Sequence, residues 1–308
     1  MLKRFTSWTF AGPVAIIFAA FLWSLDALMR QALYSLPSMV IVFSEHALGL
    51  LVTLPWLIKF WPKIKNLERR TWISIFWIAL FGGLLGTLAY TQALSYINYI
   101  NFSVVVLLQK LQPIFAIVLA RIVLKEQFQG RFFLWASMAL FGSYLVAFPD
   151  IYPEWEDGGK NVLASLLALG AAFAWGSSTV MGKYSLRDLD SRIVTPLRLG
   201  LTALLSGTFL LLFMDLGTIP RLTQTQFLYL LAIVCSSGTV ALSIYYFGLK
   251  KVQASQSTIL EMFWPISAVV IDWIFFDHAL TWSQILGALL MLTAIYRVSR
   301  RAQVNIDQ

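Results

Sequence analysis

Ten apolar stretches, each close to the length needed to cross a bilayer, alternate with short polar segments along the chain. A helix needs about 20 predominantly apolar residues to span the hydrocarbon core, and a chain in lipid must satisfy its own backbone hydrogen bonds. The pattern predicts an all-α integral membrane protein with ten transmembrane helices, at residues 11–34, 37–58, 72–95, 102–123, 131–149, 162–184, 193–214, 226–249, 255–276 and 282–298.

Basic residues gather in alternate connections between these stretches. Of the 23 Lys and Arg, 18 lie on one side of the predicted membrane and three on the other, while Lys110 and Arg198 fall inside helices. Short loops rich in Lys and Arg stay in the cytoplasm. We therefore expect a multi-pass protein of the cell inner membrane with both termini in the cytoplasm. No small-residue cleavage site follows the first apolar stretch, so we expect it to be an uncleaved helix.

The composition supports this class and narrows the partners. Hydrophobic residues make up 59% of the chain and charged residues only 12%, about half the usual share of a globular domain. The net charge of +8 sits in the loops, where it fits topology and contact with anionic lipid rather than nucleic acid. A single Cys235 and two His exclude an internal disulfide framework and a cysteine metal cluster, and we expect no cofactor.

The second half of the chain repeats the first at a constant offset of 152 residues. Chance apolar similarity would not keep one register across four pairs of helices. The sequence therefore predicts two homologous five-helix units, residues 11–149 and 162–298. Matched positions include Phe21 and Phe173, Trp23 and Trp175, Met29 and Met181, Gly86 and Gly238, Ser103 and Ser255, and Pro113 and Pro265.

The odd number of helices per unit carries a functional meaning. A second unit that follows five helices enters the membrane upside down, so the two units are expected to form an inverted repeat. Secondary transporters use this symmetry for alternating access, with a solute site near the midplane between the units. A membrane enzyme or an anchor has no comparable need for it. We therefore expect a transporter and not an enzyme.

Several repeated residues also form motifs of one family. Over residues 14–298 the chain resembles the ten-helix EamA type of the drug/metabolite transporter superfamily. The resemblance implies a secondary carrier without an ATP-binding domain, often an exporter of amino acids or other metabolites. It rests on Phe21-x-Trp23, Phe173-x-Trp175, Leu111-x-Pro113-Ile114-Phe115-Ala116 closing on Leu124-Lys125-Glu126, Trp264-Pro265-Ile266, and Gln284-x-x-Gly287.

The chain departs from the family pattern at two places. The basic residue common in the second helix is His46, whereas the seventh helix keeps Arg198. The acidic residue usual after the ninth helix reads Asp277-His278. These departures concern the identity of the solute and not the fold.

Polar residues inside the predicted spans are candidates for the solute site, because each is costly in lipid unless it is paired or lines a wet cavity. Gln109 and Glu261 are repeat-equivalent, and so are Gln112 and Trp264. We expect these four to line the cavity, with helix–helix hydrogen bonds as the alternative. Lys110 is expected either to bind an anionic group or to pair with a carboxylate such as Glu261 or Asp26. The resemblance adds Trp23, Trp175, Tyr90 and Tyr245.

A second group of residues suggests ion pairs or proton sites. Asp26 and Arg30 are four residues apart, the spacing of an intrahelical ion pair. Glu45 and His46 form a candidate proton site, because His titrates near neutral pH, with a structural polar contact as the alternative. Arg198 is also assigned to this group, although its side chain is long enough to reach the cytoplasmic interface.

Pro113 and Pro265 interrupt the fourth and ninth predicted helices, since proline cannot donate a backbone hydrogen bond. We expect paired hinges, with static kinks as the alternative. The expected function is alternating-access transport, as an exporter, of a small organic metabolite such as an amino acid, by a monomer in the bilayer. A non-transporting receptor or sensor is the competing class, and a membrane-embedded enzyme is a weaker one.

Overall fold

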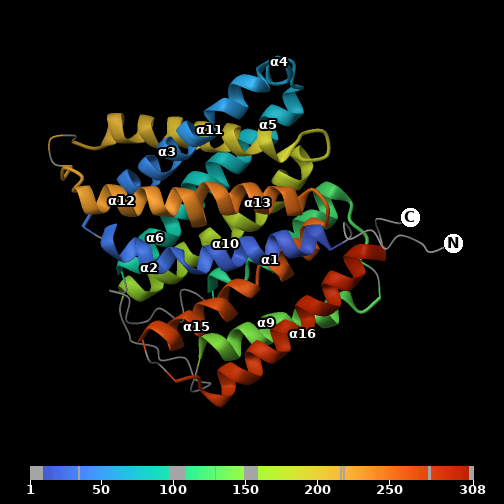
Figure 1. Ribbon diagram of the computed structural model, residues 1–308. Helices are drawn as coiled ribbons and strands as arrows, with labels where there is room; N and C mark the ends of the chain where they lie inside the picture. The colour runs from blue at the N-terminus through green and yellow to red at the C-terminus, as the bar shows by residue number, and fades with distance from the viewer. Residues whose placement is uncertain are drawn as a thin grey trace.

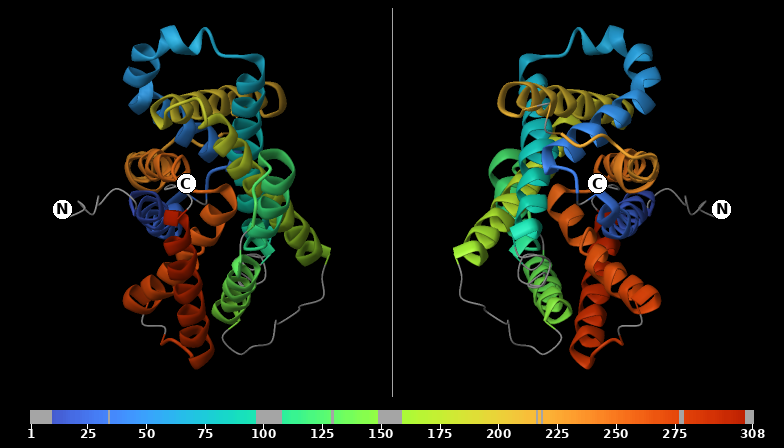
Figure 2. Two further views of the ribbon diagram at one scale, coloured as in Figure 1. Left: turned by 90° about the vertical axis from the view of Figure 1, so that its right-hand side faces the viewer. Right: turned by 90° about the vertical axis from the view of Figure 1, so that its left-hand side faces the viewer.

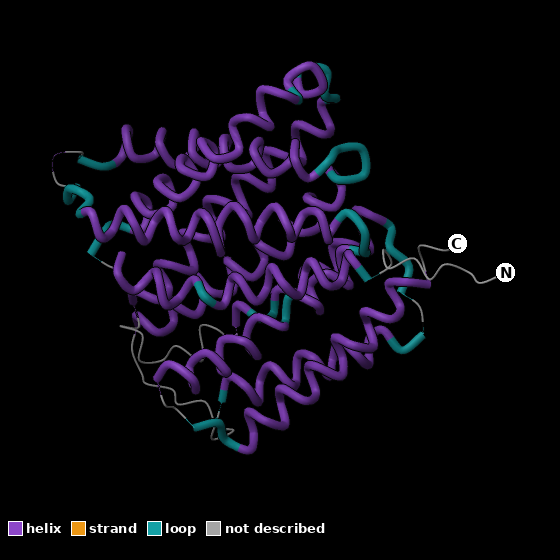
Figure 3. The backbone as a smooth tube through the Cα atoms, in the orientation of Figure 1, coloured by secondary structure: helices purple, strands orange, loops and turns teal. Residues whose placement is uncertain are grey.

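Helices and short connections account for the chain. In the computed structural model the described residues are 10–33, 35–96, 108–128, 130–148, 159–215, 217, 219–276 and 279–304, and they contain no strand (Figure 3). Segments η2, η3 and η5 are π-helical and η1 is a 3₁₀ turn. In order the elements are α1 (Ala11–Ser24), α2 (Asp26–Arg30), η1 (Gln31–Leu33), α3 (Ser38–Lys59), α4 (Trp61–Ile64), α5 (Arg69–Trp77), η2 (Ile78–Leu85), α6 (Gly86–Tyr96), α8 (Gln112–Leu119), η3 (Ala120–Leu124), α9 (Phe132–Ala147), α10 (Gly159–Ser185), α11 (Ser191–Phe213), α12 (Gln224–Ile233), η5 (Val234–Gly238), α13 (Thr239–Leu249), α14 (Ala254–Leu260), α15 (Phe263–Phe276) and α16 (Trp282–Val304).

The outer surface of the bundle is apolar. Leu211, Leu212 and Phe213 on α11 are 70%, 69% and 71% exposed, which suits contact with lipid and not with water. Within the described residues, six helical segments are long and apolar enough to cross a membrane, and two shorter apolar helices accompany them, at Gln112–Leu124 and Phe132–Ala147. The protein is therefore a multi-pass membrane protein. Residues 102–107, the first part of the fourth predicted span, lie outside the described residues.

Helices from the two halves of the sequence pack on one another in a reciprocal way (Figure 1). In the first half α1 packs against α13 and α15 of the second, and in the second half α10 packs against α6 and α8 of the first. Two further pairs join α3 to α11 and α9 to α16. Together with α15, this α9–α16 pair forms the lower part of the bundle (Figure 2). The core between the halves is thus built jointly by both.

The third and eighth predicted helices each contain a π-helical turn, and these turns lie 152 residues apart over residues 82–85 and 234–237. A π turn widens the helix and frees backbone carbonyls. In η2 the freed groups are used: Trp175 Nε1 donates to the Gly82 carbonyl at 3.1 Å, and Thr202 Oγ1 donates to the Ala79 carbonyl at 3.0 Å. The widened turns therefore join helices of opposite halves.

The fourth and ninth predicted helices are broken just before their prolines. Pro113 and Pro265 cannot donate to the carbonyls four residues back, those of Gln109 and Glu261. The chain makes turns at residues 110–111 and 261–262 instead, and Trp264 N donates to the Glu261 carbonyl at 3.0 Å. Both breaks bring polar side chains to the interior between the halves.

At the end of the bundle that carries the basic loops, Glu126 joins the halves. After η3, Lys125 adopts a left-handed φ of 57°, and Glu126 N donates to the Ala120 carbonyl at 3.2 Å, which closes the helix end. The Glu126 carboxylate then accepts from Ala254 N at 2.7 Å, Ser255 N at 3.2 Å and Ser255 Oγ at 2.6 Å. One carboxylate thus caps α14, the start of the ninth predicted helix.

Basic residues at this same end satisfy helix carbonyls. Lys183 Nζ donates to the Leu249 carbonyl at 3.0 Å, Lys250 Nζ to that of Leu189 at 2.8 Å, and an Arg187 guanidinium nitrogen to that of Leu124 at 3.1 Å. Cations stabilise the partial negative charge of helix C-termini. The positive loops therefore hold the helix ends together in addition to any effect on orientation.

We expect Gly83→Ala to destabilise the protein, because a Cβ there would lie 2.8 Å from Thr202 Cγ2 and 3.0 Å from Thr202 Cβ. Gly170→Ala on α10 is the matched control, because its Cβ would meet no atom within 4 Å. The control should unfold at the same temperature or slightly higher, since alanine favours a helix by about 1 kcal/mol. Thermal unfolding in detergent, followed by tryptophan fluorescence, measures both. Equal melting temperatures for the two variants would contradict the packing at Gly83.

We also expect Glu126→Ala to lower the melting temperature, because it leaves the buried N–H groups of Ala254 and Ser255 without an acceptor. The cost of such a loss is about 1–3 kcal/mol. Glu68→Ala is the control, since Glu68 is exposed and caps no helix with its side chain. The same unfolding assay applies. A Glu126 variant as stable as the Glu68 variant would mean that the cap contributes nothing.

Candidate functional site

A cavity of about 310 Å³ lies between the two halves. Its volume falls at the lower end of the range for pockets that bind small organic ligands. Residues of eight predicted helices line it, the first to the fourth and the sixth to the ninth. The second and seventh helices take part through Glu45, His46 and Arg198.

A chain of amide and carboxylate groups runs along one wall of the cavity. Gln109 Nε2 donates to Gln112 Oε1 at 3.1 Å, and Gln112 Nε2 donates to Glu261 Oε2 at 2.9 Å. The other carboxylate oxygen of Glu261 accepts from the Tyr245 hydroxyl at 2.8 Å and from Ser257 Oγ at 3.0 Å. The helix breaks before Pro113 and Pro265 position this chain, which joins the first half to the second.

Lys110 stands at the break of the fourth helix. Its ammonium lies 3.7 Å from the centroid of the Trp264 ring, a close cation–π contact. The sequence left open whether Lys110 binds an anionic group of the solute or pairs with a carboxylate such as Glu261 or Asp26. Among the described residues no carboxylate lies within 4 Å of it, and the Trp264 ring is its partner.

Aromatic rings from four helices face the cavity. Trp23 on α1 packs against Tyr245 on α13 with ring centroids 5.1 Å apart, and Trp175 on α10 packs against Tyr90 on α6 at 5.3 Å. In each pair the first helix of one half meets the third helix of the other. These flat, apolar faces give the cavity surfaces on which a planar ring can stack.

The opposite end of the cavity is ionic. Arg30 Nε lies 2.6 Å from Asp26 Oδ2, which is the intrahelical pair expected from the sequence, and Arg30 Nη2 lies 2.9 Å from Glu45 Oε1 on α3. Ser237 Oγ of η5 donates to Asp26 Oδ1 at 2.9 Å. His46 Nδ1 contacts the Val42 carbonyl at 2.8 Å. Glu45 therefore pairs with Arg30 and not with His46.

Arg198, the repeat-equivalent of His46, also faces the cavity instead of the membrane interface. It donates through Nη1 to the Tyr246 hydroxyl at 2.8 Å, and a Cβ on Gly82 would lie 3.1 Å from its Nη2. No carboxylate of the described chain lies within 4 Å of it. The phenol of Tyr246 is therefore its partner, and the absence of a side chain at Gly82 leaves room for the guanidinium.

The cavity brings together all the candidate residues named from the sequence except Pro265, which lies beside it on α15. Sequence reasoning missed several hydroxyl residues that also line it. Their signal was weak, because single Ser and Thr are common in transmembrane helices, although Ser178 is the repeat-equivalent of Asp26. The missed lining residues are Thr87, Thr91, Ser178, Thr179, Ser237, Thr239 and Tyr246.

Within the described residues no group of three or more His, Cys, Asp or Glu side chains is placed to hold a metal ion. The polar groups of the cavity instead suit an organic solute: amides that both donate and accept, aromatic faces, and a paired ionic end.

The chain aligns with proteins named as transporters over most of their length. The chain is 36% identical over 291 residues to "Riboflavin transporter ImpX" of Fusobacterium nucleatum subsp. nucleatum, covering 94% of this chain and 97% of that one. It is 23% identical to "Uncharacterized transporter YoaV" of Bacillus subtilis, over 69% of this chain and 72% of the relative.

One protein crystal structure shares the fold, with a TM-score of 0.75 at 17% identity, covering 94% of this chain and 98% of the other. The model of the "EamA-like transporter family" matches the chain twice, over residues 10–148 and 162–300. With the relatives at this coverage, the chain belongs to the EamA-like transporter family of the drug/metabolite transporter superfamily.

Proposed function

We propose that this protein carries a small, neutral, planar heteroaromatic solute of the riboflavin type across the cell inner membrane by alternating access. The aromatic and amide lining of the cavity carries the proposal. Trp23, Tyr90 and Trp175 offer faces for stacking, and the Gln109–Gln112 pair offers a donor and an acceptor for the edge of an imide ring. Because one relative is named a riboflavin transporter, riboflavin is the first solute to test.

The proposed substrate class is a flavin, whereas the sequence led us to expect a metabolite such as an amino acid. An amino acid has a carboxylate and an ammonium, and each needs a counter-charge in a desolvated site. Here Arg30 is already paired with two carboxylates, and Lys110 lies on the Trp264 ring.

Arg198 and Glu261 are engaged by neutral side chains, the Tyr246 hydroxyl for the first and Tyr245, Ser257 and Gln112 for the second. A neutral ring system needs no such counter-charges. Export remains the expected direction, with the termini in the cytoplasm.

The proposed mechanism uses an inverted repeat of ten transmembrane helices, in units over residues 11–149 and 162–298. The family model matches each half, the reciprocal packing of α1 and α10 exchanges the two halves, and the π turns recur at the same repeat positions. These observations support a two-fold axis in the membrane plane. Exchanging the conformations of the two units would expose the cavity to one side and then to the other.

The role proposed for the cavity gives a direct test in proteoliposomes. Counterflow of radiolabelled riboflavin should be saturable, and excess unlabelled riboflavin should compete with it, whereas excess tryptophan should not. Gln112→Ala should reduce the exchange about tenfold, because it removes an amide that bridges to Glu261. Gln224→Ala, an exposed glutamine on α12, is the control.

Two results would count against this function. Binding without counterflow would favour a receptor or sensor, and the absence of riboflavin binding would remove the flavin assignment. Vesicles of both orientations, loaded and diluted in turn, report the direction of net movement.

Pro113 and Pro265 are proposed as hinges of the moving units. Replacing both by alanine restores the two missing hydrogen-bond donors and should straighten the broken helices, so we expect a folded protein with slower counterflow. Pro55→Ala, in the exposed part of α3, is the matched control. Counterflow rates and melting temperatures of both variants measure the effect. Wild-type flux in the double variant would show that the breaks are static.

A further inference from the structure

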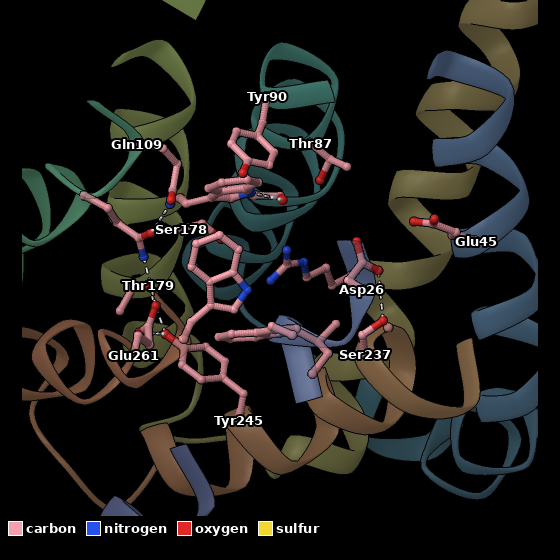
Figure 4. A pocket seen from close by; sticks show the side chains of 18 of the residues that line it. Asp26, Glu45, Thr87, Tyr90, Gln109, Ser178, Thr179, Ser237, Tyr245 and Glu261 are labelled. Carbon is pink, nitrogen blue, oxygen red and sulfur yellow. Dashed lines mark hydrogen bonds between the residues drawn. The ribbon is translucent and has the colours of Figure 1, made fainter. Parts of the chain in front are cut away.

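The cavity has two chemically different ends. Gln109, Thr179 and Glu261 lie at one end, and Asp26, Ser237 and Glu45 lie at the other, with aromatic rings between them (Figure 4). The eighth predicted helix spans both, because Ser237 contacts Asp26 and Tyr245 contacts Glu261. Eight residues of helix separate Ser237 from Tyr245, or roughly 12 Å along the axis. A solute that reaches both ends must be elongated and must carry different groups at each.

The Asp26 end has hydrogen-bonding capacity left over. A carboxylate has about four acceptor positions. Asp26 receives three donors, Arg30 Nε at 2.6 Å, Arg30 Nη2 at 3.2 Å and Ser237 Oγ at 2.9 Å. The Asp26 side chain is 25% exposed, compared with 14% for Arg30. Arg30 Nη1 has no hydrogen-bond partner. Nη1 itself is buried away from the cavity, so the capacity open to a solute is one acceptor position of Asp26 beside the Ser237 hydroxyl.

The charge and donor pattern of this end select a type of ligand group. With both carboxylates ionised, Asp26, Arg30 and Glu45 together carry one net negative charge, which disfavours a phosphate or carboxylate placed against Asp26. Arg198, the other cation of this wall, is bound to the Tyr246 hydroxyl.

An ammonium can donate to Asp26 but cannot accept a hydrogen bond from a hydroxyl of the wall. A hydroxyl group donates and accepts, so it can donate to Asp26 and accept from a lining hydroxyl. Thr87 and Ser178 supply such hydroxyls in the cavity wall.

We propose that Asp26, Arg30 and Ser237 form a subsite for a neutral polyhydroxylated chain, so that the substrate class is a planar ring joined to a polyol. The ring stacks among Trp23, Tyr90 and Trp175 with its polar edge toward Gln109 and Gln112. The chain extends toward Asp26 and binds through its hydroxyls. This inference rests on the proposed function, since riboflavin is a ring of that kind carrying a ribityl chain.

The test compares two flavins that share the ring and differ in the chain. Riboflavin carries the ribityl chain, and lumiflavin carries a methyl group in its place. Binding to the purified full-length protein is measured by calorimetry for wild type, Ser237→Ala and Asp26→Asn. Both variants should weaken riboflavin binding about five- to tenfold, the effect of losing one or two hydrogen bonds, and leave lumiflavin binding unchanged. Gln112→Ala should weaken both flavins.

Ser236→Ala is the matched control, because this neighbouring serine is half-buried, donates to the Ala232 carbonyl at 2.5 Å and does not line the cavity. It should bind both flavins as wild type does. Ser237→Ala keeps the Asp26–Arg30 ion pair, so it stays informative even if Asp26→Asn fails to fold. Equal losses for riboflavin and lumiflavin, or no loss for either, would overturn the chain subsite and leave the flavin carrier standing. A wild-type protein that binds neither flavin would overturn both.

Discussion

The structure depends on where backbone hydrogen bonding is given up inside the membrane. In lipid every N–H and C=O must find a partner, so a broken helix is tolerated only against protein or a wet cavity. Pro113 and Pro265 impose such breaks at matching places, and the broken segments supply Gln109, Lys110, Gln112, Glu261 and Trp264 to one cavity. The π turns η2 and η5 add a second pair of freed segments. The site is therefore located where regular helix stops.

Each charged side chain inside the cavity is contacted by another side chain of the protein. Arg30 is held by Asp26 and Glu45, and Glu261 is held by a tyrosine, a serine and a glutamine. Lys110 and Arg198 have aromatic or phenolic partners in place of carboxylates. Removing an ionised group from water costs several kcal/mol unless neighbours replace its hydration. These partners let the cavity hold three carboxylates, one lysine and two arginines, which is compatible with the neutral solute proposed above.

Much of this arrangement followed from the sequence. Apolar length predicted the helices, and the constant offset of 152 pointed to the matched prolines and to the cavity residues beside them. The Asp26–Arg30 pair followed from its spacing and is present. The partner of Lys110 did not follow, because a cation–π contact depends on the rotamer of Trp264 and leaves no spacing signal. The π turns were missed for a similar reason, since hydrophobic periodicity does not register one extra residue in a turn.

The two halves match in backbone far better than in charge. Asp26 corresponds to Ser178, Arg30 to Gly182 and His46 to Arg198, so only the first half builds an ion network at its end of the cavity. A symmetric backbone allows the exchange of conformations, whereas a symmetric site would present a solute with identical ends. An elongated ligand with one aromatic and one hydroxyl-rich end is accommodated only if that symmetry is broken in the side chains. The asymmetry between the halves would give the proposed two-fold carrier a single orientation of its solute.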